Sequence, residues 1–174
     1  MIRLILPLIV FLLFIFEGTI FQLLAPDRYG VSLLYIPRFM VIVIIFISIY
    51  LGKAQGVLYG VVFGFLYDVV YTEMLGLYMF VMGLVAYLFA LNYKPVQRSF
   101  TLPVLTAVMA IVALEYFLYG MYYMLNVTVM QHEAFLWLRL YPTIALNLLF
   151  AAIILLPFKK FVAYLARIER TLEE

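Results

Sequence analysis

The chain has 174 residues, of which 69% are hydrophobic and only 11% are charged. A soluble domain carries roughly 25% charged residues, so this composition predicts an integral membrane protein rather than a water-soluble domain. The absence of cysteine excludes disulfides, thiolate metal sites and thiol nucleophiles, and the net charge of +2 is too small to indicate a nucleic-acid partner.

Apolar runs along the chain predict six transmembrane helices in one bundle. We expect them at about 4–24, 34–51, 54–71, 74–92, 102–125 and 140–158. Each run approaches the roughly 20 residues that a helix needs to cross the hydrocarbon core. The first run follows Arg3 as in a signal peptide, but it is long and has no convincing cleavage site, so we expect an uncleaved span. The predicted fold is an all-α integral membrane protein, with residues 1–174 in a single domain.

The distribution of lysine and arginine predicts the orientation of this bundle. In a six-span arrangement, one side of the membrane holds Arg3, Lys53, Lys94, Arg98, Lys159, Lys160, Arg167 and Arg170. The other side holds Arg28, Arg38 and Arg139. Because positively charged residues are enriched on the cytoplasmic side, we expect both termini in the cytoplasm.

The last segment, 159–174, is a short basic amphipathic tail. Such a tail could lie on anionic lipid or bind a cytoplasmic partner, or it could simply be the positively charged flank of the last span. Near the predicted span ends there are several tyrosines, including Tyr71, Tyr78 and Tyr122. We interpret these tyrosines as an aromatic belt at the membrane interface.

The third predicted span carries Gly56, Gly60 and Gly64 at a spacing of four residues, followed four residues later by Asp68. This spacing keeps all four residues close to one face of a helix. Small residues on a membrane helix let another backbone approach closely, so these glycines predict a helix-packing face. The face would pack either inside this chain or against the helix of a separate protein.

Five ionisable residues interrupt or border the apolar runs, where a charge is costly unless it has a partner or a role. They are Glu17, Arg38, Asp68, Glu115 and Arg139. In the six-span orientation all five fall in the outer half of the membrane, at depths where they can pair. They would form either an internal ion-pair network or a site for a ligand or partner.

Few features of the sequence indicate an enzyme. His132 is the only histidine, and no sequence motif of a metalloprotease, serine hydrolase or phosphate-binding loop is present. Asp68 is the only aspartate in an apolar run, whereas an intramembrane aspartyl protease needs two. We therefore expect no catalytic residues, no metal site and no cofactor. Asn147 lies eight residues after Arg139, on roughly the same helix face, and is a further candidate for a helix–helix contact.

Three stretches together resemble the MreD family of rod shape-determining proteins. They are the run from Tyr59 to Asp68 with Tyr71-Thr72 and Leu75 to Tyr78 after it, the segment Ile36-Pro37-Arg38-Phe39, and the segment from Leu138 to Thr143 with Asn147. The resemblance implies a multi-pass protein of the bacterial cell (inner) membrane that is not an enzyme. It also implies direct binding to MreC and, through MreC, links to MreB filaments and to the elongation transpeptidase and glycosyltransferase of peptidoglycan synthesis.

The resemblance also leaves open an alternative function. The family is similar in fold to the substrate-binding subunits of energy-coupling-factor transporters, which are six-helix bundles with an outer-facing cavity. The chain could therefore be a small-molecule-binding transporter subunit whose ligand lies at the outer polar residues. Those subunits carry an Ala-x-x-x-Ala pattern in span one, and the first apolar run here has no such alanines. This absence favours the shape-determining function.

Overall fold

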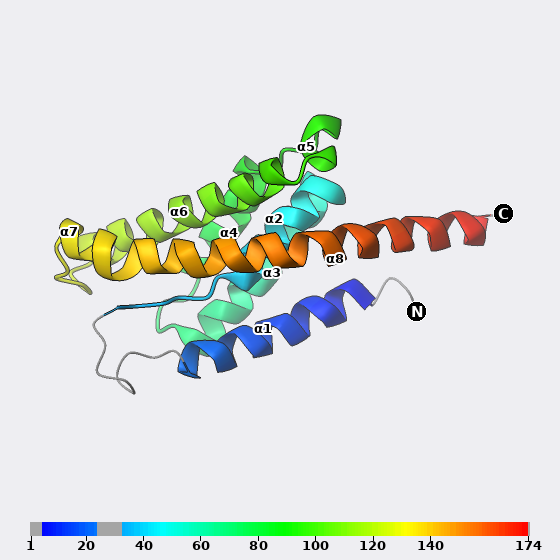
Figure 1. Ribbon diagram of the computed structural model, residues 1–174. Coiled ribbons are helices and arrows are strands. Elements are labelled where there is room, and N and C mark those ends of the chain that lie inside the picture. Colours follow the sequence, from blue (N-terminus) through cyan, green and yellow to red (C-terminus); the bar gives the residue numbers. More distant parts are fainter. Residues whose placement is uncertain (1–4, 24–32, 174) are drawn as a thin grey trace.

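The computed structural model describes residues 5–23 and 33–173, and every regular element within these ranges is helical. The elements are α1 (Ile5–Leu23), α2 (Phe39–Tyr50), α3 (Lys53–Tyr71), α4 (Leu77–Leu88), α5 (Lys94–Arg98), α6 (Thr101–Met124), α7 (His132–Ala134), the π-helix η3 (Phe135–Leu140) and α8 (Tyr141–Glu173). Helix α1 begins and α8 ends at the same end of the bundle, whereas α7 lies at the opposite end (Figure 1).

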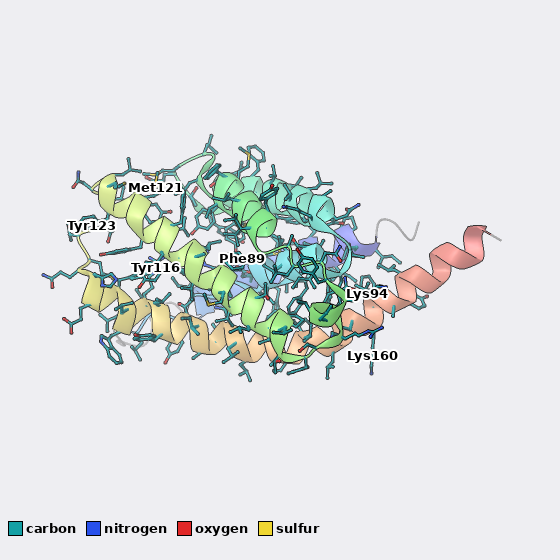
Figure 2. The ribbon with its side chains drawn as sticks, turned by 90° about the horizontal axis from the view of Figure 1, so that it is seen from above. Phe89, Lys94, Tyr116, Met121, Tyr123 and Lys160 are labelled. Carbon is teal, nitrogen blue, oxygen red and sulfur yellow. The ribbon has the colours of Figure 1, made fainter. Side chains whose placement is uncertain are left out.

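Long apolar helices identify a membrane protein. Within the described ranges, three helical segments are long and apolar enough to cross a membrane: Lys53–Tyr71, Thr101–Met124 and His132–Leu165. Shorter apolar helices cover Ile5–Ile20, Phe39–Tyr50 and Leu77–Leu88. The basic side chains of Lys94 and Lys160 lie at the end of the bundle opposite to Tyr116, Met121 and Tyr123 (Figure 2). The first predicted span, 4–24, extends one residue beyond the described part at each end.

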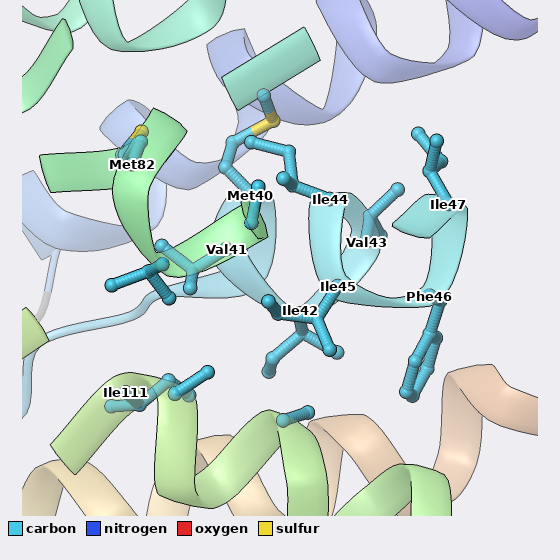
Figure 3. Close-up of a cluster of buried hydrophobic side chains, with 14 of the residues drawn as sticks. Met40, Val41, Ile42, Val43, Ile44, Ile45, Phe46, Ile47, Met82 and Ile111 are labelled. Carbon is cyan, nitrogen blue, oxygen red and sulfur yellow. The ribbon is translucent and has the colours of Figure 1, made fainter. Parts of the chain in front are cut away.

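Helix α2 lies at the centre of the bundle. All its residues from Phe39 to Ile49 are buried, and it contacts α1, α3, α4, α6 and α8. Figure 3 shows its side chains surrounded by neighbouring helices, with Met82 of α4 and Ile111 of α6 turned towards it. Ser48 is its only polar side chain before Tyr50, and the Ser48 hydroxyl donates a hydrogen bond to the carbonyl of Ile44 at 2.9 Å. A helix that is apolar on every side is stable only where other helices surround it.

The second predicted span, 34–51, differs from the structure at its start, because residues 33–38 are not helical and α2 begins only at Phe39. Pro37 explains this difference. Its ring disfavours helical geometry in the residue before it, and it has no N–H to contribute. Residues 33–38 therefore enter the bundle in an irregular conformation, with backbone groups that need partners from elsewhere.

Helix α8 and the π-helix supply those partners. The Asn147 side chain accepts a hydrogen bond from Arg38 N at 2.7 Å and donates one to Ile36 O at 2.8 Å. The Thr143 hydroxyl accepts from Ile36 N at 3.2 Å, and Leu34 N donates to Leu138 O at 2.7 Å. Asn147 is thus a helix-packing residue that replaces the missing helical hydrogen bonds of the segment before α2.

The glycine face of α3 packs inside the chain. An ideal Cβ on Gly60 would lie 2.8 Å from the carbonyl oxygen of Met82, and one on Gly64 would lie 2.5 Å from that of Tyr78. An ideal Cβ on Gly56 would overlap the side chain of Ser48 in α2. The backbones of α3 and α4 thus approach each other closely along the helix-packing face, and α4 occupies the surface that a partner's helix would need.

The last helix is longer than its predicted span, 140–158. Helix α8 continues from Tyr141 to Glu173, so most of the predicted tail 159–174 is helical and Pro157 lies within the helix. Glu174 lies outside the described residues. Pro157 is exposed and lines an apolar groove between α8 and α1. The short helices α5 and α7 and the π-helix were not predicted from the sequence.

Candidate functional site

Three of the five predicted ionisable residues meet around one carboxylate. Glu115 of α6 is fully buried, and its Oε1 lies 2.7 Å from Arg38 Nε. Its Oε2 lies 2.9 Å from Nη2 of Arg139 and also accepts a hydrogen bond from Arg139 Nε. We call Arg38, Glu115 and Arg139 the arginine–glutamate cluster. It links the segment before α2 to α6 and to η3, and each buried charge in it has an oppositely charged partner, which lowers the cost of burial.

A π-helical turn places Arg139 in this cluster. The turn runs from Phe135 to Leu140 and joins α7 to α8. Phe135 is fully buried, and its ring stacks on Tyr119 of α6 with centroids 4.2 Å apart. Single π-turns inside helices are rare and are frequently found at functional sites. No motif in the sequence signals this turn.

Glu17 lies near the cluster but binds other groups. Its Oε2 accepts a hydrogen bond from Met40 N at 2.7 Å, and its Oε1 accepts one from the hydroxyl of Tyr67. A carboxylate at the first turn of a helix meets unpaired N–H groups and the positive end of the helix dipole. Glu17 therefore connects α1 by hydrogen bonds to the start of α2 and to α3. Tyr67, which the sequence analysis did not single out, completes this contact.

Asp68 has a different role from the pairing that the sequence suggested. Its two oxygens accept hydrogen bonds from Gly76 N at 2.9 Å, Tyr78 N at 2.8 Å and Met79 N at 3.0 Å. These N–H groups belong to the start of α4 and the residue before it. Within the described part of the chain, Asp68 forms no ion pair with a basic residue. It caps α4 instead, one helical turn beyond Gly64.

This capping role predicts the effect of Asp68→Ala. We expect the first turn of α4 to open more often, because three backbone N–H groups lose their acceptor, and stability to fall by about 1–2 kcal/mol. Hydrogen–deuterium exchange of residues 76–79 in detergent would show faster exchange. Glu73→Ala, which removes an exposed carboxylate from the same loop, is the matched control. Unchanged exchange at residues 76–79 in Asp68→Ala would contradict the capping role.

A cavity of about 480 Å³ opens beside the cluster. Glu17, Arg38 and Arg139 line it, together with Tyr67, Tyr71, Tyr78 and Tyr122. The lining residues come from α1, α3, α4, α6 and η3, from the segment before α2, and from the loops after α3 and α6. Tyr71, Tyr78 and Tyr122 were predicted only as members of an aromatic belt, and the structure places them in the cavity wall. No pattern in the sequence predicts that these tyrosines line a cavity, because the cavity is formed by segments far apart in the chain.

The cavity wall combines charged groups with aromatic rings. The Arg38 guanidinium lies 5.4 Å from the centroid of the Tyr78 ring, and its Nη2 donates to the Tyr78 hydroxyl at 3.3 Å. Tyr78 in turn stacks on Tyr67, with ring centroids 5.3 Å apart. In the described residues there is no group of three or more histidine, aspartate or glutamate side chains suited to a metal ion. The arginines and tyrosines of the wall offer hydrogen bonds, charge and apolar contact to a ligand.

Comparison with known proteins identifies similar chains. Residues 2–165 match the family model described as rod shape-determining protein MreD. The rod shape-determining protein MreD of Bacillus subtilis (strain 168) is 33% identical over 159 residues, which cover 91% of this chain and 92% of that protein. No solved structure matches the chain.

Proposed function

Because the chain belongs to the MreD family of rod shape-determining proteins, we propose that it is a non-enzymatic membrane component of the bacterial cell-elongation machinery. In this proposal it binds MreC directly in the inner membrane and helps to couple MreB filaments to lateral peptidoglycan synthesis. Through MreC it meets the elongation transpeptidase and glycosyltransferase. The observation that carries the proposal is the similarity to a rod shape-determining protein over nearly the full length of both chains.

The proposal includes six membrane crossings by a single domain, with both termini in the cytoplasm. Helices α2 and α4 have only 12 residues each, or about 18 Å of helix. Residues 33–38 before α2 can add up to about 20 Å in an extended conformation. This segment and α2 together can therefore cross a core of about 30 Å. The placement of Lys94 and Lys160 at the end where α1 begins and α8 ends supports a cytoplasmic location of that end.

The roles of the buried polar residues support a binding rather than a catalytic function. Glu17 and Asp68 accept hydrogen bonds at the starts of helices, and Glu115 neutralises two arginines. Each of these carboxylates is thus engaged in holding helices together. A general acid or base would instead have to exchange protons with a substrate.

The partner's helix requires a surface other than the glycine face, which α4 occupies. Apolar side chains remain exposed on other faces of α3 and α8, among them Leu58, Phe65, Leu149 and Ile153. In a membrane protein such faces contact lipid or another transmembrane helix. Either face is therefore available to the single span of MreC.

Co-purification tests the proposal. The full chain is co-expressed with tagged MreC and, separately, with an unrelated tagged single-span protein, and each pair is purified in a mild detergent. We expect the chain to be retained by MreC and not by the unrelated protein. Equal retention in both purifications would overturn the proposal and favour the small-molecule-binding transporter subunit.

Two double variants then locate the interface. Leu58→Ala with Phe65→Ala changes the exposed face of α3, and Leu149→Ala with Ile153→Ala changes that of α8. Both pairs lie outside the buried core, so each serves as a control for the other. Loss of MreC from only one of them would assign the contact to that helix.

A further inference from the structure

Two guanidinium groups that share a single carboxylate line one side of the cavity beside the arginine–glutamate cluster. We propose that it binds an amphipathic ligand whose single anionic oxygen group, a phosphodiester or a carboxylate, contacts the guanidinium groups of Arg38 and Arg139. The apolar part of this ligand would lie against the tyrosine-rich wall. The proposal does not rest on binding to MreC.

The charge balance is the first argument. Arg38 and Arg139 share one carboxylate, that of Glu115, so two positive charges face one negative charge. Glu17 also lines the cavity, but its oxygens are bound by Met40 N and Tyr67, at the positive end of the α2 dipole. Glu17 thus makes no direct ion pair with either guanidinium. Within the described residues, Glu115 is the one carboxylate that Arg38 and Arg139 contact directly.

Unused hydrogen-bond donors are the second argument. A guanidinium carries five N–H donors in a planar fork that matches carboxylate and phosphate oxygens. Arg38 uses Nε for Glu115 and Nη2 for Tyr78, and Arg139 directs both Nε and Nη2 at one Glu115 oxygen. Neither Nη1 takes part in these bonds to the described residues. The two guanidinium groups can therefore donate further hydrogen bonds to an acceptor such as an oxyanion.

The rest of the wall indicates what the anionic group is attached to. Around the arginines the cavity is lined by Tyr67, Tyr71, Tyr78 and Tyr122, and by apolar residues such as Ile36 and Val127. The volume of about 480 Å³ lies in the usual range of small-molecule sites. Glu73 also lines the cavity, but its side chain is exposed and therefore solvated. The cavity fits either the headgroup region of an anionic membrane lipid or a soluble aromatic carboxylate.

Binding measurements on the purified full chain in a neutral maltoside detergent test this proposal. The probes are dioctanoyl phosphatidylglycerol, benzoate and, as the uncharged control, dioctanoylglycerol. The shift of the melting temperature is recorded against probe concentration for the wild type, Arg139→Gln and Arg98→Gln. Arg98 is an exposed arginine of α5, distant from the cavity, and its variant removes the same charge.

We expect a saturable shift with phosphatidylglycerol or with benzoate, and none with dioctanoylglycerol. Arg139→Gln should weaken that binding about tenfold or more, as expected for a lost charge-assisted hydrogen bond, and Arg98→Gln should leave it unchanged. Binding of phosphatidylglycerol alone identifies a membrane phosphodiester, and binding of benzoate alone identifies a soluble carboxylate. The proposal is overturned if neither probe binds, or if dioctanoylglycerol binds as well as phosphatidylglycerol.

A second variant keeps the test decisive if Arg139→Gln does not fold. Val127 lines the cavity with 58% of its surface exposed and is not part of the arginine–glutamate cluster, so we expect Val127→Trp to narrow the cavity and leave the cluster's ion pairs in place. We expect this variant to fold with a melting temperature close to that of the wild type and to lose probe binding. Unchanged probe binding in folded Val127→Trp would place the probe elsewhere and overturn the proposal.

Discussion

Gly64→Ala should destabilise the folded protein by about 1–3 kcal/mol, the usual cost of overpacking a well-packed interior. The added Cβ would lie 2.5 Å from the carbonyl oxygen of Tyr78 and 2.7 Å from Met79 Cα. Both are backbone atoms, so no side chain can rotate away and α4 itself must move. That movement also lengthens the hydrogen bonds that Tyr78 N and Met79 N donate to the Asp68 carboxylate. Thermal unfolding in detergent would show a lower melting temperature.

Gly120→Ala is the matched control for this prediction. Gly120 lies in α6, and a Cβ built on it meets no atom within 4 Å. The same substitution there should leave stability unchanged or raise it by up to about 1 kcal/mol, because alanine favours a helix more than glycine does. Equal melting temperatures for the two variants would show that α3 and α4 are not held at the separation described here.

Glu115→Gln should have the largest effect of any single substitution in the arginine–glutamate cluster. The change removes the only carboxylate that Arg38 and Arg139 share and leaves two guanidinium charges facing each other in the bundle. Breaking a buried ion pair costs on the order of 3–5 kcal/mol. We expect a much lower melting temperature and a reduced yield of folded protein. Glu133→Gln, at an exposed position of α7, should melt like the wild type.

A double variant separates charge from packing in this experiment. Adding Arg139→Gln to Glu115→Gln removes one of the two uncompensated charges while keeping a side chain of polar character. If charge is the cause, the double variant should be more stable than Glu115→Gln alone. A double variant that is less stable than either single one would show that shape and hydrogen bonding, rather than charge, dominate the cluster.

The sequence predicted the helical membrane fold and the polar residues of its interior, for reasons that the structure makes clear. Apolar runs and glycine spacing are local properties, and they placed α3, α6 and the glycine face within a few residues. The partners of the polar residues are not local. Glu17 and Asp68 were candidates either for ion pairs with arginines or for a ligand or partner site. A sequence displays its charged side chains but not the N–H groups at the start of a folded helix, which bind both carboxylates here.

Two further features lay beyond prediction for the same reason. The break before α2 is signalled by Pro37, but its depth in the bundle depends on Asn147, which is 109 residues away from Arg38. The π-helical turn at Phe135–Leu140 depends on the packing of Phe135 against Tyr119 rather than on a motif. The break before α2 and the π-helical turn thus depend on where residues lie in the folded bundle rather than on residue type alone.

The dependence of α2 on Asn147 has a consequence for biogenesis. During synthesis the ribosome releases Ile36 and Arg38 more than a hundred residues before the asparagine that binds them. Until the last helix emerges, the backbone groups Ile36 O and Arg38 N before the newly made α2 lack these partners, and the bilayer offers none. The segment that leads into the central helix therefore gains these backbone partners only near the end of translation.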